Sequence, residues 1–249
     1  MYLNLSGKRA LVTGASSGLG MHFAQVLAAA GAHVILAARR MPALEDVALR
    51  IREKGGDCET AALDLTDHSS LAALAPLLTG IDVVVNNAGM VRDAAALDQR
   101  AVDWDAVFDT NLKGMFLLSQ VAAQVMIDER RGGSIINITS ILGMRQAGGV
   151  LPYAVSKAGA VQLTKTLALE WARYGIRVNA IAPGYVETDL NSGFFGSEAG
   201  KALVRRIPQR RLGQLSDLDG PLLLLASEAS AYMTGSVVTV DGGHLVSSL

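Results

Sequence analysis

The sequence predicts one α/β domain over residues 1–249, built on a doubly wound parallel β-sheet of about seven strands with helices on both faces. Two observations predict this class. Short apolar runs alternate with longer helical stretches along the whole chain, which is the pattern of repeated β-α units. The apolar runs are continuous Val, Ile, Leu and Ala segments, as expected for strands that are buried on both faces of a sheet.

The individual elements follow from these runs. Because such sheets bind ligands beyond the carboxyl ends of their strands, we expect the functional residues directly after strands. The predicted strands are Arg9–Thr13, His33–Ala37, Thr60–Leu63, Val83–Val85, Ile135–Ile138, Val178–Ile181 and Val237–Val240. The predicted helices are Leu19–Ala30, Leu44–Lys54, Ser69–Leu78, Val102–Ile127, Tyr153–Tyr174 and Ser216–Leu225.

The least regular stretch of the chain is Gly184–Gly213, which has no clean hydrophobic period. Long loops in compact domains are often functional. We therefore interpret residues 184–213 as a mobile substrate lid. A plain surface excursion is the alternative.

Composition and charge exclude several classes of function. Lys and Arg number 22 against 23 Asp and Glu, so nothing indicates a nucleic acid or an anionic membrane as the main partner. The single cysteine, Cys58, permits no intramolecular disulfide, and Met1–Gly7 lacks the features of a secretion signal. We expect a cytoplasmic protein with no membrane span. The four histidines lack metal-ligand spacing, so no metal site is expected.

A glycine-rich turn follows the first strand and leads into a helix. It runs from Thr13 to Gly20 as TGASSGLG, with glycines at 14, 18 and 20. Glycine allows a tight turn and the close approach of a phosphate. The following helix start offers free N–H groups and a positive dipole end to an anion. The turn therefore predicts a dinucleotide phosphate site.

The end of the second strand bears on which dinucleotide is bound. Sites for NAD usually carry an Asp or Glu there, which holds the ribose 2′-hydroxyl. Here Ala38 stands in that place, and Arg39 follows it. A guanidinium matches phosphate geometry, so we predict NADP(H) with Arg39 on the 2′-phosphate. The alternative is that Arg39 and Arg40 are solvated surface charges.

Four polar residues form the candidate catalytic group. Tyr153 and Lys157 lie four residues apart in a helical stretch, so they share one face, and a nearby ammonium lowers the pKa of a tyrosine from about 10. Ser140 follows the fifth strand, where its hydroxyl can stabilise charge on a substrate oxygen. Asn111 lies in an otherwise apolar segment, and a buried amide there needs partners. The Tyr–Lys spacing alone is a weak signal, and its weight comes from the other motifs.

In order and spacing these motifs resemble the short-chain dehydrogenase/reductase family, with the 3-oxoacyl-[acyl-carrier-protein] reductases closest in pattern. The resemblance implies a Rossmann-type fold and catalysis by Asn111, Ser140, Tyr153 and Lys157, with Asn111 holding a water that links Lys157 to solvent. It rests on the glycine turn, Asn86–Gly89 after the fourth strand, Asn111, Ser140, Tyr153-Ala-Val-Ser-Lys157, Pro183-Gly184 after the sixth strand and Val240–Gly243 after the last.

The resemblance also implies contacts with NADP(H). Asp64 would accept a hydrogen bond from the adenine amino group, with the Leu65 backbone beside it. Val186 and Thr188 would hold the nicotinamide carboxamide. The full predicted cofactor set is Gly14, Ser16, Ser17, Gly18, Leu19, Gly20, Arg39, Asp64, Leu65, Asn87, Ala88, Gly89, Tyr153, Lys157, Pro183, Gly184, Val186 and Thr188.

The predicted substrate pocket is mostly apolar, which favours a ketone or a 3-oxoacyl group over a sugar. Gln146 is its main polar exception, and Arg145 is interpreted as facing water. The expected walls are Met90, Val91, Ile141–Leu151, Tyr185, Phe194 and Phe195. The predicted substrate contacts are Ser140, Leu142, Met144, Gln146, Tyr153, Tyr185 and Phe194.

These predictions describe an NADPH-dependent reductase of a small-molecule ketone or 3-oxoacyl carbonyl. A polyol, sugar or steroid dehydrogenase that works in oxidation is the alternative. A non-catalytic dinucleotide sensor ranks last, because all four catalytic residues are present. By resemblance we expect a homotetramer formed through helices Val102–Ile127 and Tyr153–Tyr174 and the C-terminal segment. Acyl carrier protein stays open as a partner, because Arg130, Arg131 and Arg173 lie near helix ends.

Overall fold

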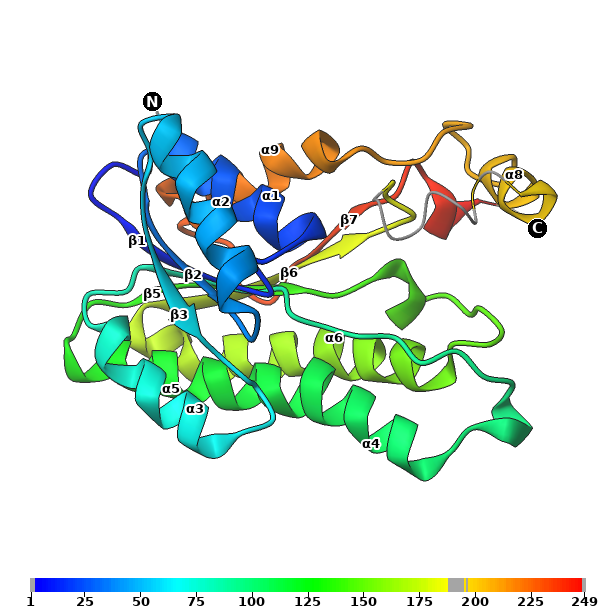
Figure 1. Ribbon diagram of the computed structural model, residues 1–249, viewed down its shortest axis with the longest axis horizontal. Coiled ribbons are helices and arrows are strands. Elements are labelled where there is room, and N and C mark those ends of the chain that lie inside the picture. Colours follow the sequence, from blue (N-terminus) through cyan, green and yellow to red (C-terminus); the bar gives the residue numbers. More distant parts are fainter. Residues whose placement is uncertain (1–2, 188–194, 196, 248–249) are drawn as a thin grey trace.

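The seven predicted strands form one parallel sheet in the order β3-β2-β1-β4-β5-β6-β7 (Figure 1). The structure, a computed structural model, describes residues 3–187, 195 and 197–247. The chain reverses its winding direction between β1 and β4, and such a reversal leaves a crevice at the carboxyl ends of the strands. The strands are β1 Arg9–Thr13, β2 His33–Ala38, β3 Asp57–Ala62, β4 Val83–Asn86, β5 Gly133–Ile138, β6 Ile176–Pro183 and β7 Val237–Val240.

Burial along the strands explains why their sequences are continuously apolar. Every residue of β4 is buried, whereas the edge strands β3 and β7 include exposed residues. This difference also explains one boundary. Strand β3 begins at Asp57, three residues before the predicted Thr60. The residues before Thr60 include Asp57 and Glu59, so they form no apolar run that would mark a strand in the sequence.

Helices cover both faces of the sheet (Figure 1). Each layer buries its own apolar cluster against the sheet. One layer holds α1 Gly18–Ala29, α2 Met41–Glu53 and α9 Asp219–Ala226. The other holds α3 His68–Leu74, α4 Ala101–Phe108, α5 Met115–Asp128 and α6 Leu151–Trp171. The doubly wound prediction is therefore confirmed.

The predicted helix Val102–Ile127 is interrupted. A π-helical turn, Asp109–Gly114, separates α4 from α5. Gly114 packs closely against Leu65, because a Cβ on residue 114 would lie 2.6 Å from the Leu65 Cβ atom. The hydrophobic period of residues 102–127 does not reveal the π-helical turn, since the contact with Leu65 comes from a distant part of the chain.

The stretch predicted to be irregular contains a short helix, α8 Glu198–Val204, whose first turn is capped by the Ser197 hydroxyl. Two backbone hydrogen bonds join the ends of the stretch, from Glu187 to Gly213 and from Gly213 to Tyr185, both at 2.9 Å. The predicted lid, residues 184–213, lies partly outside the described residues and stays a prediction. Within the described part of the chain, none of the helices combines the length and apolarity needed to cross a membrane.

Candidate active site

A cleft of about 500 Å³ opens at the carboxyl ends of the central strands. It brings together residues from five separate segments of the chain, as expected at the reversal between β1 and β4. Thr139 and Ile138 are lining residues that were not predicted. The full lining is Leu19, Asn87, Gly89, Met90, Val91, Ile138, Thr139, Ser140, Tyr153, Lys157, Pro183, Gly184, Tyr185 and Val186.

The glycine-rich turn forms one side of this cleft. Gly14 and Gly18 have φ of +66° and +54°, which side-chain-bearing residues rarely adopt. A Cβ on Gly20 would collide with the Gly14 carbonyl, whereas one on Gly18 would meet nothing within 4 Å. The turn is therefore packed on its inner side and open at Gly18. The first turn of α1 has no acidic residue, so its positive end is available to an anion.

Thr13 joins this turn to the segment after β4. Its hydroxyl accepts hydrogen bonds from the backbone N–H groups of Asn87 and Ala88, both at 3.0 Å. The Asn87 side chain in turn donates to the Thr13 carbonyl at 2.9 Å. Thr13 thus fixes the glycine-rich turn after β1 to Asn87 and Ala88 after β4, which are two of the predicted cofactor residues.

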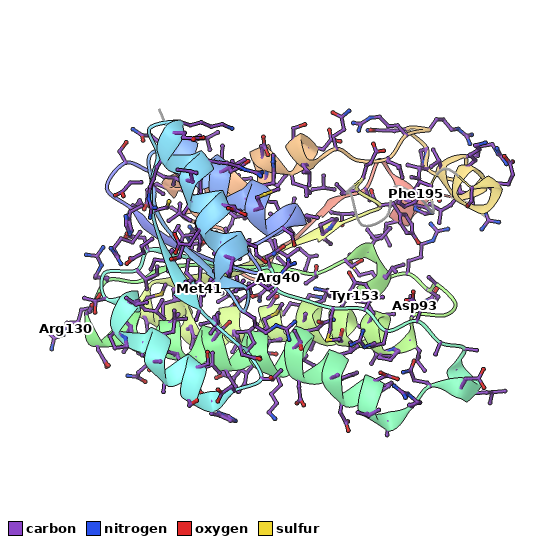
Figure 2. All side chains as sticks on the ribbon, in the orientation of Figure 1. Arg40, Met41, Asp93, Arg130, Tyr153 and Phe195 are labelled. Atoms are coloured by element: carbon purple, nitrogen blue, oxygen red, sulfur yellow. The ribbon has the colours of Figure 1, made fainter. Side chains whose placement is uncertain are left out.

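Arg40, and not Arg39, contacts the glycine-rich turn. Its guanidinium donates to the hydroxyls of Ser16 and Ser17 at 3.2 and 3.3 Å, and it lies between the two helical layers (Figure 2). Arg39 is exposed and lies on the side of Asp64. The sequence shows two adjacent arginines after β2, but it does not distinguish which of them turns toward the serines.

Asp64 follows β3 and is held in a local turn. Its carboxylate accepts from the Thr66 backbone at 2.9 Å and from the Thr66 hydroxyl at 2.7 Å. These bonds, with a smaller contribution from Arg39, lower the pKa of Asp64. The neighbouring Leu65 side chain is buried. Asp64 is therefore an ionised acceptor at the carboxyl end of β3, which is the chemistry predicted for it.

Ser140 and Tyr153 meet across the cleft. Both side chains line the cleft, and the Ser140 oxygen accepts from the Leu142 backbone at 3.1 Å. Burial raises the pKa of Tyr153, and the Ser140 hydroxyl opposes that effect. In the protein alone, Tyr153 is therefore a protonated phenol with a hydroxyl partner.

Lys157 lies beneath Tyr153, one helical turn along α6. Its ammonium is 5.6 Å from the centre of the Tyr153 ring and donates to the Ile138 carbonyl at 2.7 Å. The residue is only 3% exposed, and burial lowers its pKa to about 8. Such a lysine can give up a proton close to neutral pH.

Asn111 is fully buried in the π-helical turn. Its side-chain oxygen accepts from the Met90 backbone at 2.8 Å, and its amide donates to the Met90 carbonyl and the Ser156 hydroxyl at 2.9 and 3.2 Å. These are the partners that a buried amide requires. A Cβ on Gly89 would lie near both the Asn111 oxygen and the Lys157 nitrogen, so the two side chains face the same point.

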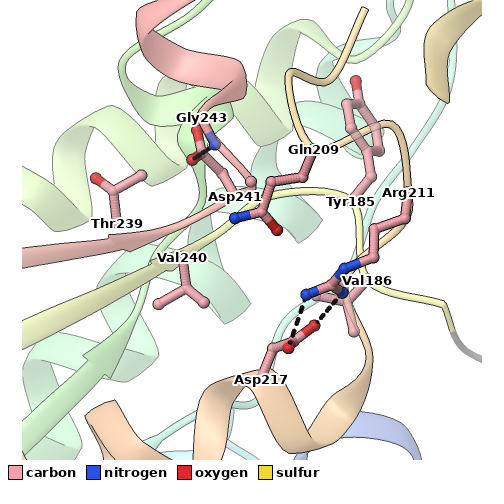
Figure 3. A pocket seen from close by; sticks show the side chains of 11 residues that line it. Tyr185, Val186, Gln209, Arg211, Asp217, Thr239, Val240, Asp241 and Gly243 are labelled. Carbon is pink, nitrogen blue, oxygen red and sulfur yellow. Dashed lines mark hydrogen bonds and ion pairs between the residues drawn. The ribbon is translucent and has the colours of Figure 1, made fainter. Parts of the chain in front are cut away.

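The substrate side of the site agrees only in part with the predicted contacts. Tyr185 lines the cleft and also a second cavity of about 350 Å³, in which Arg211 pairs with Asp217 (Figure 3). Leu142, Met144 and Gln146 do not line the cleft, and the last two are exposed. Thr188 and Phe194 lie outside the described residues.

Across the described ranges, no group of three or more His, Cys, Asp or Glu residues could hold a metal ion. The cleft offers hydroxyl, amide, ammonium and backbone N–H groups instead. Groups of this kind bind oxygen atoms and transfer protons.

Comparison with known proteins places this site in a family. A family model described as enoyl-(acyl carrier protein) reductase matches residues 14–244. The chain is 37% identical over 249 residues to a gluconate 5-dehydrogenase of Gluconobacter oxydans, covering 98% of this chain and 97% of the relative. It is 37% identical over 248 residues to a 3-oxoacyl-[acyl-carrier-protein] reductase of Thermotoga maritima, covering 98% and 100%.

Solved structures agree. A gluconate 5-dehydrogenase from Burkholderia cenocepacia, in complex with NADP and tartrate, superposes with a TM-score of 0.94 at 36% identity over 99% of this chain and 98% of that one. The family model and the relatives span nearly the whole chain, and the cleft is lined by the predicted Ser140, Tyr153 and Lys157, with Asn111 buried behind Gly89 of its wall. The chain belongs to the short-chain dehydrogenase/reductase family of oxidoreductases.

Proposed function

We propose that the protein is an NADP-dependent oxidoreductase that reduces a ketone or 3-oxoacyl carbonyl to a secondary alcohol, with Tyr153 as the general acid. The observation that carries this proposal is the placement of Ser140 and Tyr153 together in the cleft, with Lys157 beneath the tyrosine ring. A carbonyl oxygen in the cleft would meet two hydroxyl donors at once. This arrangement supports proton transfer to that oxygen.

The residues around the glycine-rich turn fit NADP. The turn is open at Gly18, no carboxylate stands at Ala38, and Arg40 is held over Ser16 and Ser17. These features suit a 2′-phosphate, which an acidic side chain at the end of β2 would repel. A related structure, titled a putative 2-deoxy-D-gluconate 3-dehydrogenase from Agrobacterium tumefaciens, contains NADP at 41% identity and a TM-score of 0.92, over 98% of this chain and 99% of that one.

Each catalytic side chain has a separate role in the proposed reduction. NADPH, when bound, supplies a hydride to the carbonyl carbon. Tyr153 donates its proton to the carbonyl oxygen while Ser140 hydrogen bonds to the same atom. Lys157 replaces that proton, because burial brings its pKa to about 8. Asn111 faces the same point as Lys157 and supports a path for protons from solvent.

A paired substitution tests this proposal. Tyr153→Phe removes only the hydroxyl, and we expect kcat for NADPH-dependent ketone reduction to fall by about 10²–10⁴-fold. Tyr232→Phe is the control, since Tyr232 is fully exposed and belongs to the loop before β7. The measurement is NADPH oxidation across a panel of ketones and 3-oxoacyl thioesters. A Tyr153→Phe enzyme that kept most of its activity would contradict the proposed mechanism.

Oxidation of a polyol or sugar acid is the second candidate. Several relatives are named gluconate 5-dehydrogenase or 2-dehydro-3-deoxy-D-gluconate 5-dehydrogenase. The same site would run in reverse, with Tyr153 accepting a proton. Alcohols and sugar acids with NADP belong in the same panel, and a rate that exceeds every reduction would favour this candidate.

We also propose that the protein is a homotetramer. Exposed residues on α6 form one stripe with spacings of four, three, four and seven, which is typical of a helix that packs against another. The stripe consists of Leu151, Val155, Ala158, Gln162 and Leu169.

Acyl carrier protein remains open as a partner, and one of the curated relatives is named for it. The cytoplasmic location stays a prediction from the sequence.

A further inference from the structure

We infer that Arg145 binds a carboxylate of the substrate, so that the enzyme acts on an oxo or hydroxy acid and not on a neutral apolar ketone. This inference rests on the proposed function and names the substrate class for the same site. It replaces the interpretation of Arg145 as a residue that faces water.

The position of Arg145 is fixed relative to the catalytic residues. Its backbone N–H donates to the Ile141 carbonyl at 2.7 Å, in the turn that starts at Ser140. Gly143 of this turn packs directly on α6, because a Cβ there would lie 2.7 Å from the Lys157 carbonyl carbon. The turn that carries Arg145 is therefore anchored at both Ser140 and Lys157.

The guanidinium of Arg145 uses only one of its nitrogens. Nη1 donates to the His244 carbonyl and, at 3.1 Å, to the Ser247 hydroxyl. Among the described residues, neither Nε nor Nη2 has a hydrogen-bond partner, and no carboxylate pairs with this side chain. The edge formed by Nε and Nη2 is one that binds a carboxylate through two parallel hydrogen bonds. The guanidinium is thus held in place with a suitable edge unused.

His244 completes the polar end of the site. It is 5% exposed, and its Nδ1 atom is buried with no hydrogen-bond partner among the residues that the structure describes. Burial lowers the pKa of His244, the charges of Arg145 and Arg206 lower it further, and the Asp241 carboxylate opposes them. The imidazole is therefore neutral near pH 7, and the ring adds no charge of its own beside Arg145.

Tyr185 connects this polar end to the catalytic cleft. It lines the cleft together with Ser140 and Tyr153, and its ring lies 5.6 Å from the ring of His244. The Arg145 guanidinium donates to the carbonyl of His244, the residue whose ring faces Tyr185. Burial raises the pKa of Tyr185, while the charge of Arg145 acts in the opposite direction. An acid whose carbonyl lies at Tyr153 would extend past Tyr185 toward Arg145.

Matched substrates separate substrate binding from a structural role. We would measure NADPH-dependent reduction of straight-chain oxo acids of increasing length, each against its own methyl ester, which keeps the carbonyl and removes the charge. The variants are Arg145→Gln and Arg145→Lys. Arg50→Gln is the control, because it makes the same change of charge at an exposed position on α2, and no residue of that helix lines the cleft.

The wild type should prefer at least one acid over its ester. Arg145→Gln should raise KM for that acid by about 10- to 100-fold, the usual effect of losing a charged hydrogen bond, and leave the ester within about twofold. Arg145→Lys should retain part of the preference. An equal loss on acid and ester would show that Arg145 only tethers the C-terminal segment, and would overturn the inference.

The absence of any acid preference in the wild type would overturn it as well. Neither result would affect the proposed function, since ester reduction would continue. Failure of the wild type to reduce any carbonyl with NADPH would instead count against the proposed function.

Discussion

Arg40 shows how one side chain can organise a binding site before the ligand arrives. Both arginines are exposed, but the Arg40 guanidinium already donates to the two serine hydroxyls of the glycine-rich turn, whereas the charge of Arg39 acts on Asp64. A phosphate placed at Ser16 and Ser17 would therefore meet Arg40 without a large rearrangement of its side chain. Less conformational entropy is lost when a group is preorganised in this way.

The two arginines should differ in their effect on cofactor choice. We expect Arg40→Ala to raise KM for NADPH by about 10- to 100-fold while leaving KM for NADH nearly unchanged, because only NADPH carries the phosphate. Arg39→Ala should have a smaller effect. Arg50→Ala, an exposed arginine on α2, serves as the control. A larger loss for Arg39→Ala than for Arg40→Ala would restore the assignment made from sequence.

At the scale of elements, a histidine joins two strands at the edge of the sheet. His33 begins β2, and its two ring nitrogens lie 2.8 Å from Asp57 and 2.9 Å from Glu59, both in β3. Arg9 of β1 donates to Glu59 at 3.0 Å. Burial by itself would lower the pKa of His33, but the two carboxylates raise it overall. The imidazolium therefore stabilises the pairing of β2 with the edge strand.

This arrangement predicts a pH-dependent stability. The folded pKa of His33 lies above its unfolded value of about 6.5, so its contribution is complete below pH 6.5 and is lost as pH rises through the folded pKa. The difference in unfolding free energy between wild type and His33→Gln should shrink over that window in denaturant titrations. His68→Gln, at the exposed start of α3, should show no such trend. A constant difference for His33→Gln would contradict the prediction.

The elements that could be predicted from sequence are those whose burial leaves a local pattern. Strand β1 has its predicted bounds because an apolar run between polar residues marks a strand covered on both faces, and the apolar run of the edge strand β7 likewise lies between the polar Ser236 and Asp241. The π-helical turn Asp109–Gly114 left no such pattern. It depends on contacts of Asn111 with Met90 and of Gly114 with Leu65, which come from other segments.

The candidate site divides in the same way. Tyr153 and Lys157 are linked by helical spacing, and Ser140 by its position after a strand, so sequence sufficed to predict the residues that line the cleft together. The direction of a flexible side chain is not encoded in its neighbours. Arg40 turns toward Ser16, and Arg145 toward Ser247, through contacts made only in the folded chain.

For the whole molecule, the main feature outside the cleft is the exposed apolar stripe on α6. Leu169 is 82% exposed and Val155 is 40% exposed, while Val102 of the neighbouring α4 is 63% exposed. Exposed apolar residues gathered on adjacent helices are typical of a protein interface. Since α6 also carries Tyr153 and Lys157, association through this face would stabilise the helix that positions the catalytic pair.

A charge placed in this stripe should weaken the proposed tetramer. We expect Leu169→Glu to shift the protein from four copies to a smaller species in sedimentation velocity, because association would bury an unpaired carboxylate. Leu49→Glu is the matched control, since Leu49 is 56% exposed on α2 in the opposite helical layer. Both variants should fold, because each residue is exposed in the single chain. A wild type that sediments as a single chain, or an equal shift for the two variants, would contradict assembly through α6.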